Sequence, residues 1–174
     1  MTREQVQHVI RATATIANER SLVVIDSQAV LLPYPDANPD LLVSRELDPY
    51  PAMAPDKSDL IEGTIGALSQ FDETFGDYAN GVSPDTAVMP PEWMRRASLH
   101  DLGDTTVACP DMHDLVVSKC VAGREKDARF VAVMQKEKMI SLSTLEPPIQ
   151  QLDPMDPIES LIASARRRAE EASA

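Results

Sequence analysis

A small set of residues carries side chains whose types and spacing suit phosphate chemistry. Glu46 and Asp48 lie two residues apart at the end of a short apolar run that predicts a β-strand, so both carboxylates should point to the same face. Ser27 follows a four-residue apolar strand pattern and supplies a hydroxyl at the expected turn. Lys119 lies in a long helical pattern, and the charged run 124–127 follows that helix.

These residue types match the needs of a Mg²⁺-dependent reaction on a phosphate group. Mg²⁺ is a hard cation that takes one or two carboxylates and fills its other positions with water and substrate phosphates. A lysine neutralises phosphate charge, and a hydroxyl with backbone amides at a helix start binds phosphate oxygens. Paired acids on a strand are also common on solvated surfaces, and helix lysines are mostly exposed. Composition alone therefore does not select the catalytic interpretation.

Other kinds of site find no support in the sequence. The six glycines form no Walker or dinucleotide-binding motif, which argues against a kinase or a dehydrogenase. His8, His100 and His113 lie far apart and lack the spacing of zinc ligands. Ser27 has no neighbouring glycine to permit the strained turn of a serine hydrolase.

Length and charge restrict the class of protein. The chain has 174 residues, enough for one domain with its own core, and a net charge of −12. The negative charge disfavours generic nucleic-acid and membrane-surface binders, because both need a positive field. Cys109 and Cys120 are too few for a disulfide scaffold and are predicted to be buried thiols. Without a signal-peptide core or an apolar run of membrane-spanning length, we expect a cytoplasmic protein with no membrane partner.

Hydrophobic periodicity predicts a mixed set of strands and helices. Pro49 and Pro51 are expected to end the second strand, because proline disrupts regular pairing. The irregular alternation of elements favours a mixed α+β domain over a doubly wound sheet. Strands are predicted over 22–25, 41–48 and 105–109, and helices over 3–20, 28–32, 58–68, 111–122, from about 125, over 143–152 and over 157–174.

Three stretches resemble one protein family. Residues 23–31 (VVIDSQAVL), 46–51 (ELDPYP) and above all 113–127 (HDLVVSKCVAGREKD) are similar to bacterial nucleotidyltransferase-like proteins. That family is distantly similar to the abortive-infection nucleotidyltransferase toxins of toxin–antitoxin pairs. The third stretch is the most specific. Its order of a helix lysine, a short gap, Ala-Gly-Arg and then Lys-Asp is hard to obtain from hydrophobic patterning alone. The resemblance covers roughly residues 3–152.

The resemblance implies a fold and a reaction. The fold is a nucleotidyltransferase-like mixed sheet flanked by helices, with a helical C-terminal part. The domain spans 1–152, with a sheet portion over about 1–110 and a helical portion over about 111–152, and a helical tail follows over 153–174. Such enzymes transfer a nucleoside monophosphate from a nucleoside triphosphate to an acceptor hydroxyl, with Mg²⁺ as cofactor. The partners it implies are a nucleoside triphosphate, an RNA or protein acceptor and an antitoxin-like protein.

The resemblance also implies roles for single residues. In the family, a Gly-Ser pair after the first strand binds the triphosphate, and Ser27 matches its serine. The acids that bind the metal match Glu46 and Asp48. A helix lysine and a later aspartate, which contact phosphate and assist the attacking group, match Lys119 and Asp127. We therefore predict Asp48, Lys119 and Asp127 as catalytic residues, Ser27, Gln28, Lys119 and Arg124 as nucleotide-binding residues, and Glu46 and Asp48 as metal ligands.

One departure from the family pattern leaves two functions open. Asp26 stands where the pattern has glycine, which adds a side chain and a negative charge beside an anionic triphosphate. The first hypothesis is a Mg²⁺-dependent nucleotidyltransferase of a toxin-like kind, and the retained acids and lysine favour it. The second is a catalytically degenerate fold that acts as a binding or regulatory protein. Asp26 and the charge of −12 favour the second.

Overall fold

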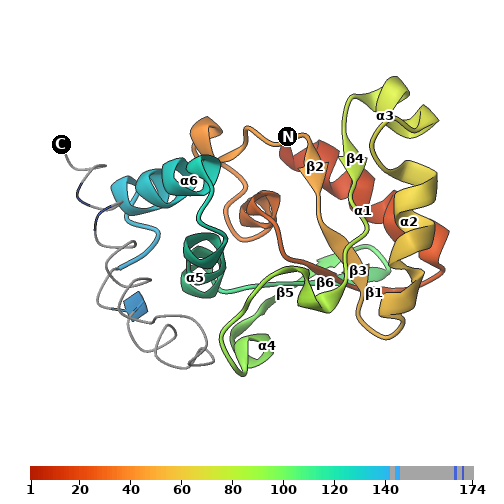
Figure 1. The fold of residues 1–174 in the computed structure, drawn as a ribbon. Helices are drawn as coiled ribbons and strands as arrows, with labels where there is room; N and C mark the ends of the chain where they lie inside the picture. The colour runs from red at the N-terminus through yellow and green to blue at the C-terminus, as the bar shows by residue number, and fades with distance from the viewer. Residues whose placement is uncertain (142–143, 146–166, 168–169, 171–174) are drawn as a thin grey trace. The chain divides into compact units, whose positions relative to one another are not determined.

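The computed structural model describes residues 1–141, 144–145, 167 and 170 (Figure 1). The chain divides into two compact units, and each is considered by itself. The sheet unit comprises residues 1–86 and 97–109, and the helical unit comprises residues 87–96 and 110–174. Apart from residues 144, 145, 167 and 170, the helices predicted over 143–152 and 157–174 lie outside the described residues. The predicted boundaries at 110 and 152 stay predictions.

A four-stranded mixed sheet forms the centre of the sheet unit, in the order β3-β1-β6-β5 (Figure 1). β1 pairs parallel with β6 and antiparallel with β3, and β5 pairs antiparallel with β6. Three of the four β1 residues are buried, as expected of a strand with neighbours on both sides. A second sheet pairs β2 and β4 in parallel. The strands are β1 Ser21–Val24, β2 Glu46–Leu47, β3 Pro49–Pro51, β4 Tyr78–Ala79, β5 Ser98–Leu102 and β6 Thr105–Cys109.

Helix α1 confirms the first predicted helix and its cap. The Gln5 amide N–H donates to Thr2 Oγ1 over 3.2 Å, and the Thr2 amide donates to Gln5 Oε1 over 2.7 Å. This reciprocal capping box fixes the helix start, and the apolar stripe beyond it is buried. The helices of the sheet unit are α1 Arg3–Ala17, α2 Ser58–Ile65 and α3 Gln70–Phe75, with short 3₁₀ helices η1 Ser27–Leu31, η2 Pro39–Leu41, η3 Pro55–Lys57 and η4 Pro84–Thr86.

Two predictions about the middle of the chain are wrong. The strand predicted over 41–48 is reduced to the two residues of β2. The start of the predicted strand instead belongs to the 3₁₀ helix η2, which the Asn38 side chain caps. Pro49 and Pro51 do not end pairing but form β3. Two backbone hydrogen bonds flank β3: the Ile25 N–H donates to the Asp48 carbonyl (3.2 Å), and the Ala52 N–H donates to the Ser21 carbonyl (2.9 Å). The residues on either side of β3 therefore bond to β1 and the residue after it, and the prolines alternate with them. The prolines therefore occupy positions that need no donor toward β1.

The strand β5 and the helix α4 were not predicted. β5 carries Ser98, His100 and Asp101, and none of its residues is fully buried. It lies at the edge of the sheet, where a strand keeps one neighbour and needs little apolar character. α4, Trp93–Arg96, is a single turn of helix between prolines and the start of β5.

The helical unit is built on α5, Met112–Ala122, and α6, Glu125–Lys136 (Figure 1). Asp111 caps α5 by accepting the His113 amide over 2.9 Å, and Gly123 ends it in the left-handed conformation. Both boundaries agree with the prediction. Eight of the eleven α5 residues are buried, including the charged Asp114 and Lys119. Among the described residues, no helix combines the length and apolar character needed to cross a bilayer.

Candidate functional site

The turn after β1 positions the predicted serine. Asp26 occupies the N-cap position of η1, and Ser27 is the first residue of that 3₁₀ helix. The Ser27 hydroxyl donates to Asp26 Oδ1 over 3.0 Å, and the Asp26 side chain is almost completely buried. The carboxylate that replaces the glycine of the family pattern therefore engages the hydroxyl that was predicted to bind phosphate.

The two predicted metal ligands, Glu46 in β2 and Asp48 directly after it, lie on the same face of the chain. The Ile25 N–H donates to the Asp48 carbonyl over 3.2 Å, which places Asp48 beside the end of β1. Along the chain, Glu46 and Asp48 are half-buried, whereas Leu47 between them is fully buried. This alternation places both carboxylates on the more exposed face, as their spacing predicted.

The neighbouring strand β4 and the residue that follows it supply one hydrogen-bond donor to each acid. Tyr78 Oη donates to Glu46 Oε2 over 3.2 Å, and Asn80 Nδ2 donates to Asp48 Oδ1 over 3.1 Å. The parallel pairing of Glu46 with Tyr78 produces this match, since both strands then present alternate residues to the same face. Sequence reasoning missed Tyr78 and Asn80 because they lie 32 residues from their partners.

Electrostatics keep Tyr78 in its donor form. Burial, together with the charge of Glu46 and the hydrogen bond to it, raises the pKa of Tyr78 above its ordinary value. The phenol therefore remains protonated through and beyond the neutral range. On the opposite, buried side, burial also raises the pKa of Asp77, and neither of its carboxylate oxygens has a hydrogen-bond partner among the described residues.

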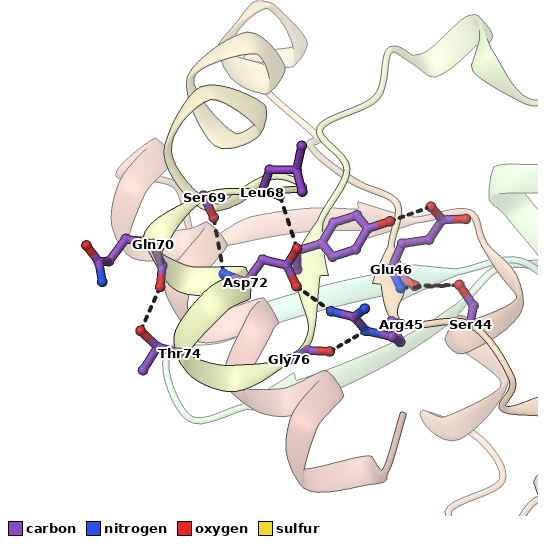
Figure 2. Close-up of polar contacts among 10 residues, drawn as sticks. Ser44, Arg45, Glu46, Leu68, Ser69, Gln70, Asp72, Thr74 and Gly76 are labelled. Carbon is purple, nitrogen blue, oxygen red and sulfur yellow. Dashed lines mark hydrogen bonds and ion pairs between the residues drawn. The ribbon is translucent and has the colours of Figure 1, made fainter.

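A salt bridge fixes the loop before β2 to helix α3. Arg45 Nη2 contacts Asp72 Oδ1 at 2.5 Å, and Arg45 Nε donates to the Gly76 carbonyl over 2.7 Å. Figure 2 shows Arg45 reaching α3 while the adjacent Glu46 side chain points away from it. The backbone that carries Glu46 is therefore tied to α3 on one side and to β4 on the other.

Glu46 and Asp48 are the two carboxylates that could hold Mg²⁺, as a two-ligand site. Among the described residues, no group of three or more His, Cys, Asp or Glu side chains is arranged to hold a metal ion. Mg²⁺ is commonly bound by one or two carboxylates together with water and substrate phosphates. The donors Tyr78 and Asn80 orient Glu46 and Asp48, as groups behind metal-binding carboxylates usually do.

Gln28, a predicted nucleotide-binding residue, is fully buried in η1. Within the part of the chain that the structure describes, neither its amide nitrogen nor its amide oxygen has a hydrogen-bond partner. Buried amides without partners are rare, because each carries the full cost of lost hydration. The structure thus places Gln28 in the interior, directly after the Ser27 turn.

The helical unit brings Lys119, Arg124 and Asp127 together at the α5–α6 junction. Lys119 Nζ lies 3.8 Å from Asp127 Oδ1, and the Arg124 side chain donates to both oxygens of Asp127, over 2.7 and 3.2 Å. The Arg124 backbone N–H also donates to Asp127, over 3.2 Å. Lys119 Nζ lies 5.9 Å from the ring centre of Phe130, a cation–π distance. Lys119 and Asp127 are both buried.

A second ion pair in the helical unit, in which only the acid is buried, was not predicted. Asp114, buried in α5, accepts two hydrogen bonds from Arg96, from Nε over 2.8 Å and from Nη2 over 2.9 Å. The hydrogen bonds to Asp114 raise the pKa of Arg96 above its ordinary value. This bidentate pair ties α4 to α5. Nothing local in the sequence indicates it, because Arg96 precedes Asp114 by 18 residues.

A protein-family model described as a nucleotidyltransferase of unknown function (DUF6036) matches residues 4–160. The chain belongs to this family. No curated protein and no solved structure matches it. The mixed α+β fold expected of a nucleotidyltransferase is confirmed, with its four-stranded sheet and flanking helices. The relation to abortive-infection toxins stays a prediction.

The predicted site residues of this family member divide between the two units. The structure places Glu46 and Asp48 on one face and brings Lys119, Arg124 and Asp127 into contact, but it buries Gln28 in the interior. The sheet unit holds Ser27, Gln28, Glu46 and Asp48, and the helical unit holds Lys119, Arg124 and Asp127.

Tyr78→Phe tests whether the β4 donors orient the acids. Removing the hydroxyl leaves the ring in place but takes one hydrogen bond from Glu46, so we expect Mg²⁺-dependent nucleotide binding to weaken by about 10-fold, within the usual range for such supporting groups. Isothermal titration with Mg²⁺ at a fixed triphosphate concentration measures the change. Tyr34→Phe, at an exposed tyrosine of the same unit, is the matched control. Equal affinities of the two variants would contradict the orienting role.

Proposed function

We propose that this protein transfers a nucleoside monophosphate from a nucleoside triphosphate to an acceptor hydroxyl, and that Glu46 and Asp48 hold the Mg²⁺ that the reaction uses. The observation that supports this most is the carboxylate pair on one half-exposed face beside the Ser27 turn, in a chain of a nucleotidyltransferase family. In the reaction, the acceptor oxygen bonds to the α-phosphorus, the bond to the β-phosphate oxygen breaks, and pyrophosphate and the hydroxyl proton leave.

The chain's own residues have distinct proposed tasks. When bound, Mg²⁺ would screen the phosphate charge. Glu46 and Asp48 would hold it, with Tyr78 and Asn80 keeping both carboxylates oriented. Lys119 and Arg124 would supply positive charge to the phosphates, and we propose that Lys119 and Asp127 contact phosphate and assist the attacking group. Their mutual contacts at the α5–α6 junction support a common task. Ser27 would bind the nucleotide from the turn after β1, whereas the fully buried Gln28 lies behind that turn.

The biological setting is proposed from the resemblance of the chain to bacterial nucleotidyltransferase-like proteins, a family that is distantly similar to abortive-infection toxins. In that setting the acceptor is an RNA or a protein, the protein acts in the cytoplasm, and an antitoxin-like protein controls it. The transfer of labelled nucleotide to RNA or protein is the direct measurement.

A specific observation favours a second function. Asp26 holds the Ser27 hydroxyl at 3.0 Å and adds a carboxylate beside the place where a triphosphate would lie. Like charges disfavour binding, and an engaged hydroxyl must exchange partners to reach a phosphate. The second candidate is therefore a catalytically degenerate nucleotidyltransferase fold that acts as a binding or regulatory protein.

Asp26→Gly distinguishes the two functions. If the enzyme hypothesis holds, the wild type binds at least one triphosphate in the presence of Mg²⁺. The glycine variant should bind it about tenfold more tightly, because one nearby like charge costs on the order of 1 kcal/mol even with the full screening of bulk water. Calorimetry with each of the four triphosphates, with and without Mg²⁺, measures the affinities.

The matched variant Asp26→Asn separates charge from size, since asparagine keeps the side-chain volume of aspartate. We expect it to recover most of the gain in affinity. A wild type that binds no triphosphate, combined with a glycine variant that does, would refute the enzyme hypothesis and establish a degenerate site. Absence of binding in all three proteins would refute both a catalytic and a degenerate nucleotide site.

A further inference from the structure

The α2–α3 corner, residues 58–76 of the sheet unit, presents large apolar side chains to solvent. The inner face of α2 is buried, whereas Leu60 is 51% exposed, Leu68 89% and Phe75 50%. These are three of the nine exposed large apolar side chains in the described part of the chain. Exposed apolar area is therefore concentrated at this corner, which is typical of a protein-binding surface.

Leu68 occupies a backbone conformation that favours glycine. Its φ is +62°, in the left-handed region that leucine adopts only at an energetic cost. The Leu68 N–H donates to Asp72 Oδ2 over 3.0 Å, and the Asp72 N–H donates to Ser69 Oγ over 3.2 Å, which fixes the turn (Figure 2). Glycine would fit this turn without strain, and the exposed leucine side chain adds almost nothing to packing. Stability of the fold therefore does not account for a leucine here.

The corner is held as a preformed surface. Asp72 uses its other carboxylate oxygen to pair with Arg45, which also donates to the carbonyl of Gly76 at the end of α3 (Figure 2). His8 of α1 lies against the rings of Phe71 and Phe75, with ring centres 5.1 and 4.5 Å apart. A surface that is already ordered loses little conformational entropy when a partner binds.

The charge of the corner selects the kind of partner. Residues 58–76 contain four acidic side chains, Asp59, Glu62, Asp72 and Glu73, and no lysine, arginine or histidine, and the Arg45 side chain that contacts the corner pairs with Asp72. The resulting negative field repels nucleic acids and anionic membranes. It also disfavours a second copy of this chain, whose net charge is −12. The complementary partner is a basic protein surface.

We propose that the α2–α3 corner docks a basic protein partner. Leu68 inserts into an apolar pocket of that partner, and Asp59 and Glu73 face lysine or arginine side chains at the pocket's rim. Central apolar anchors with a charged rim are the usual organisation of such interfaces. The docking of this partner does not depend on the proposed reaction.

A defined amphipathic peptide tests the surface. The probe is a synthetic helix with leucine on one face and lysine on the other, titrated into the full chain with nitrogen-15 labelling. We expect chemical-shift changes concentrated at residues 58–76. Leu68→Asn, which tolerates the left-handed backbone but removes the apolar side chain, should weaken binding by about tenfold, as loss of an interface anchor does. Glu73→Lys should weaken it as well.

Matched variants separate docking from folding. Leu99→Asn removes a leucine of similar exposure from β5 and should leave the affinity unchanged. Leu68→Gly should raise the melting temperature by about 2–4 °C, because glycine relieves the backbone strain. The same variant should weaken binding of the peptide, because it removes the apolar side chain. Shift changes elsewhere on the protein, equal binding by Leu68→Asn and wild type, or equal binding of a peptide with glutamate in place of lysine would each overturn the proposal.

Discussion

Replacing Asp48 by asparagine should abolish Mg²⁺-dependent nucleotide binding and leave the melting temperature of the protein nearly unchanged. A neutral amide oxygen is a much poorer ligand for a hard cation than a carboxylate, so we expect a loss on the order of 100-fold in apparent affinity for the metal. The side chain is half-buried and keeps its size, and its amide oxygen still accepts from Asn80 Nδ2. The expected change in melting temperature is therefore within about 2 °C. Calorimetry and thermal unfolding measure the two quantities.

Asp36→Asn is the control for this experiment, because Asp36 is an exposed aspartate of the same unit outside the paired acids. It should change neither quantity. If Asp48→Asn instead lowers the melting temperature strongly, Asp48 is a structural residue that holds Asn80 and β4. If both properties of the Asp48 variant match those of the wild type, Mg²⁺ binds elsewhere.

Elements with local signals in the sequence were predicted well. The capping box of Thr2 and Gln5 and the apolar stripe behind it are contained within the helix that they start. The same holds for α5, where Asp111 caps the start and Gly123 supplies the left-handed end. The apolar run of β1 was recognisable because a central strand is buried on both faces. In each case the interactions that decide the structure join residues close together in the chain.

Elements decided by distant partners, or with little apolar character, were missed. Pro49 and Pro51 were expected to end a strand, and only their pairing with residues 22–24 shows that they occupy the tolerant positions of an edge. The pairing of β5 is local, since β6 follows after two residues, and β5 was missed because it has too little apolar character to indicate a strand. β4 has only two residues, which is too short for any periodicity. Single-sequence patterns carry no information about such pairings.

The candidate site divides in the same way. Two carboxylates two residues apart share a face by local geometry, and Glu46 and Asp48 do so. Their donors Tyr78 and Asn80 come from 32 residues further along the chain, and no local pattern marks them. The side-chain bond between Ser27 and Asp26 was also not predicted, although it bears most directly on whether phosphate can bind.

Asp127→Ala should lower the free energy of unfolding by about 3–5 kcal/mol, the usual cost of removing one partner from a buried ion pair. Asp127 is 1% exposed, and its loss leaves the buried Lys119 without the carboxylate at 3.8 Å. It also removes the acceptor of three hydrogen bonds from Arg124 at the α5–α6 junction. The corresponding fall in melting temperature is on the order of 10 °C. Urea and thermal unfolding, followed by circular dichroism, measure the loss.

Glu125→Ala is the matched control, because it removes an exposed acid of the same helix whose pair with Arg129 is solvated. Its effect should stay below about 1 kcal/mol. The double variant Lys119→Met with Asp127→Leu removes both buried charges and should recover much of the lost stability. If this double variant is stable but binds no triphosphate, the pair serves the reaction as well as the fold. A double variant that is stable and binds nucleotide normally would restrict Lys119 and Asp127 to a structural role.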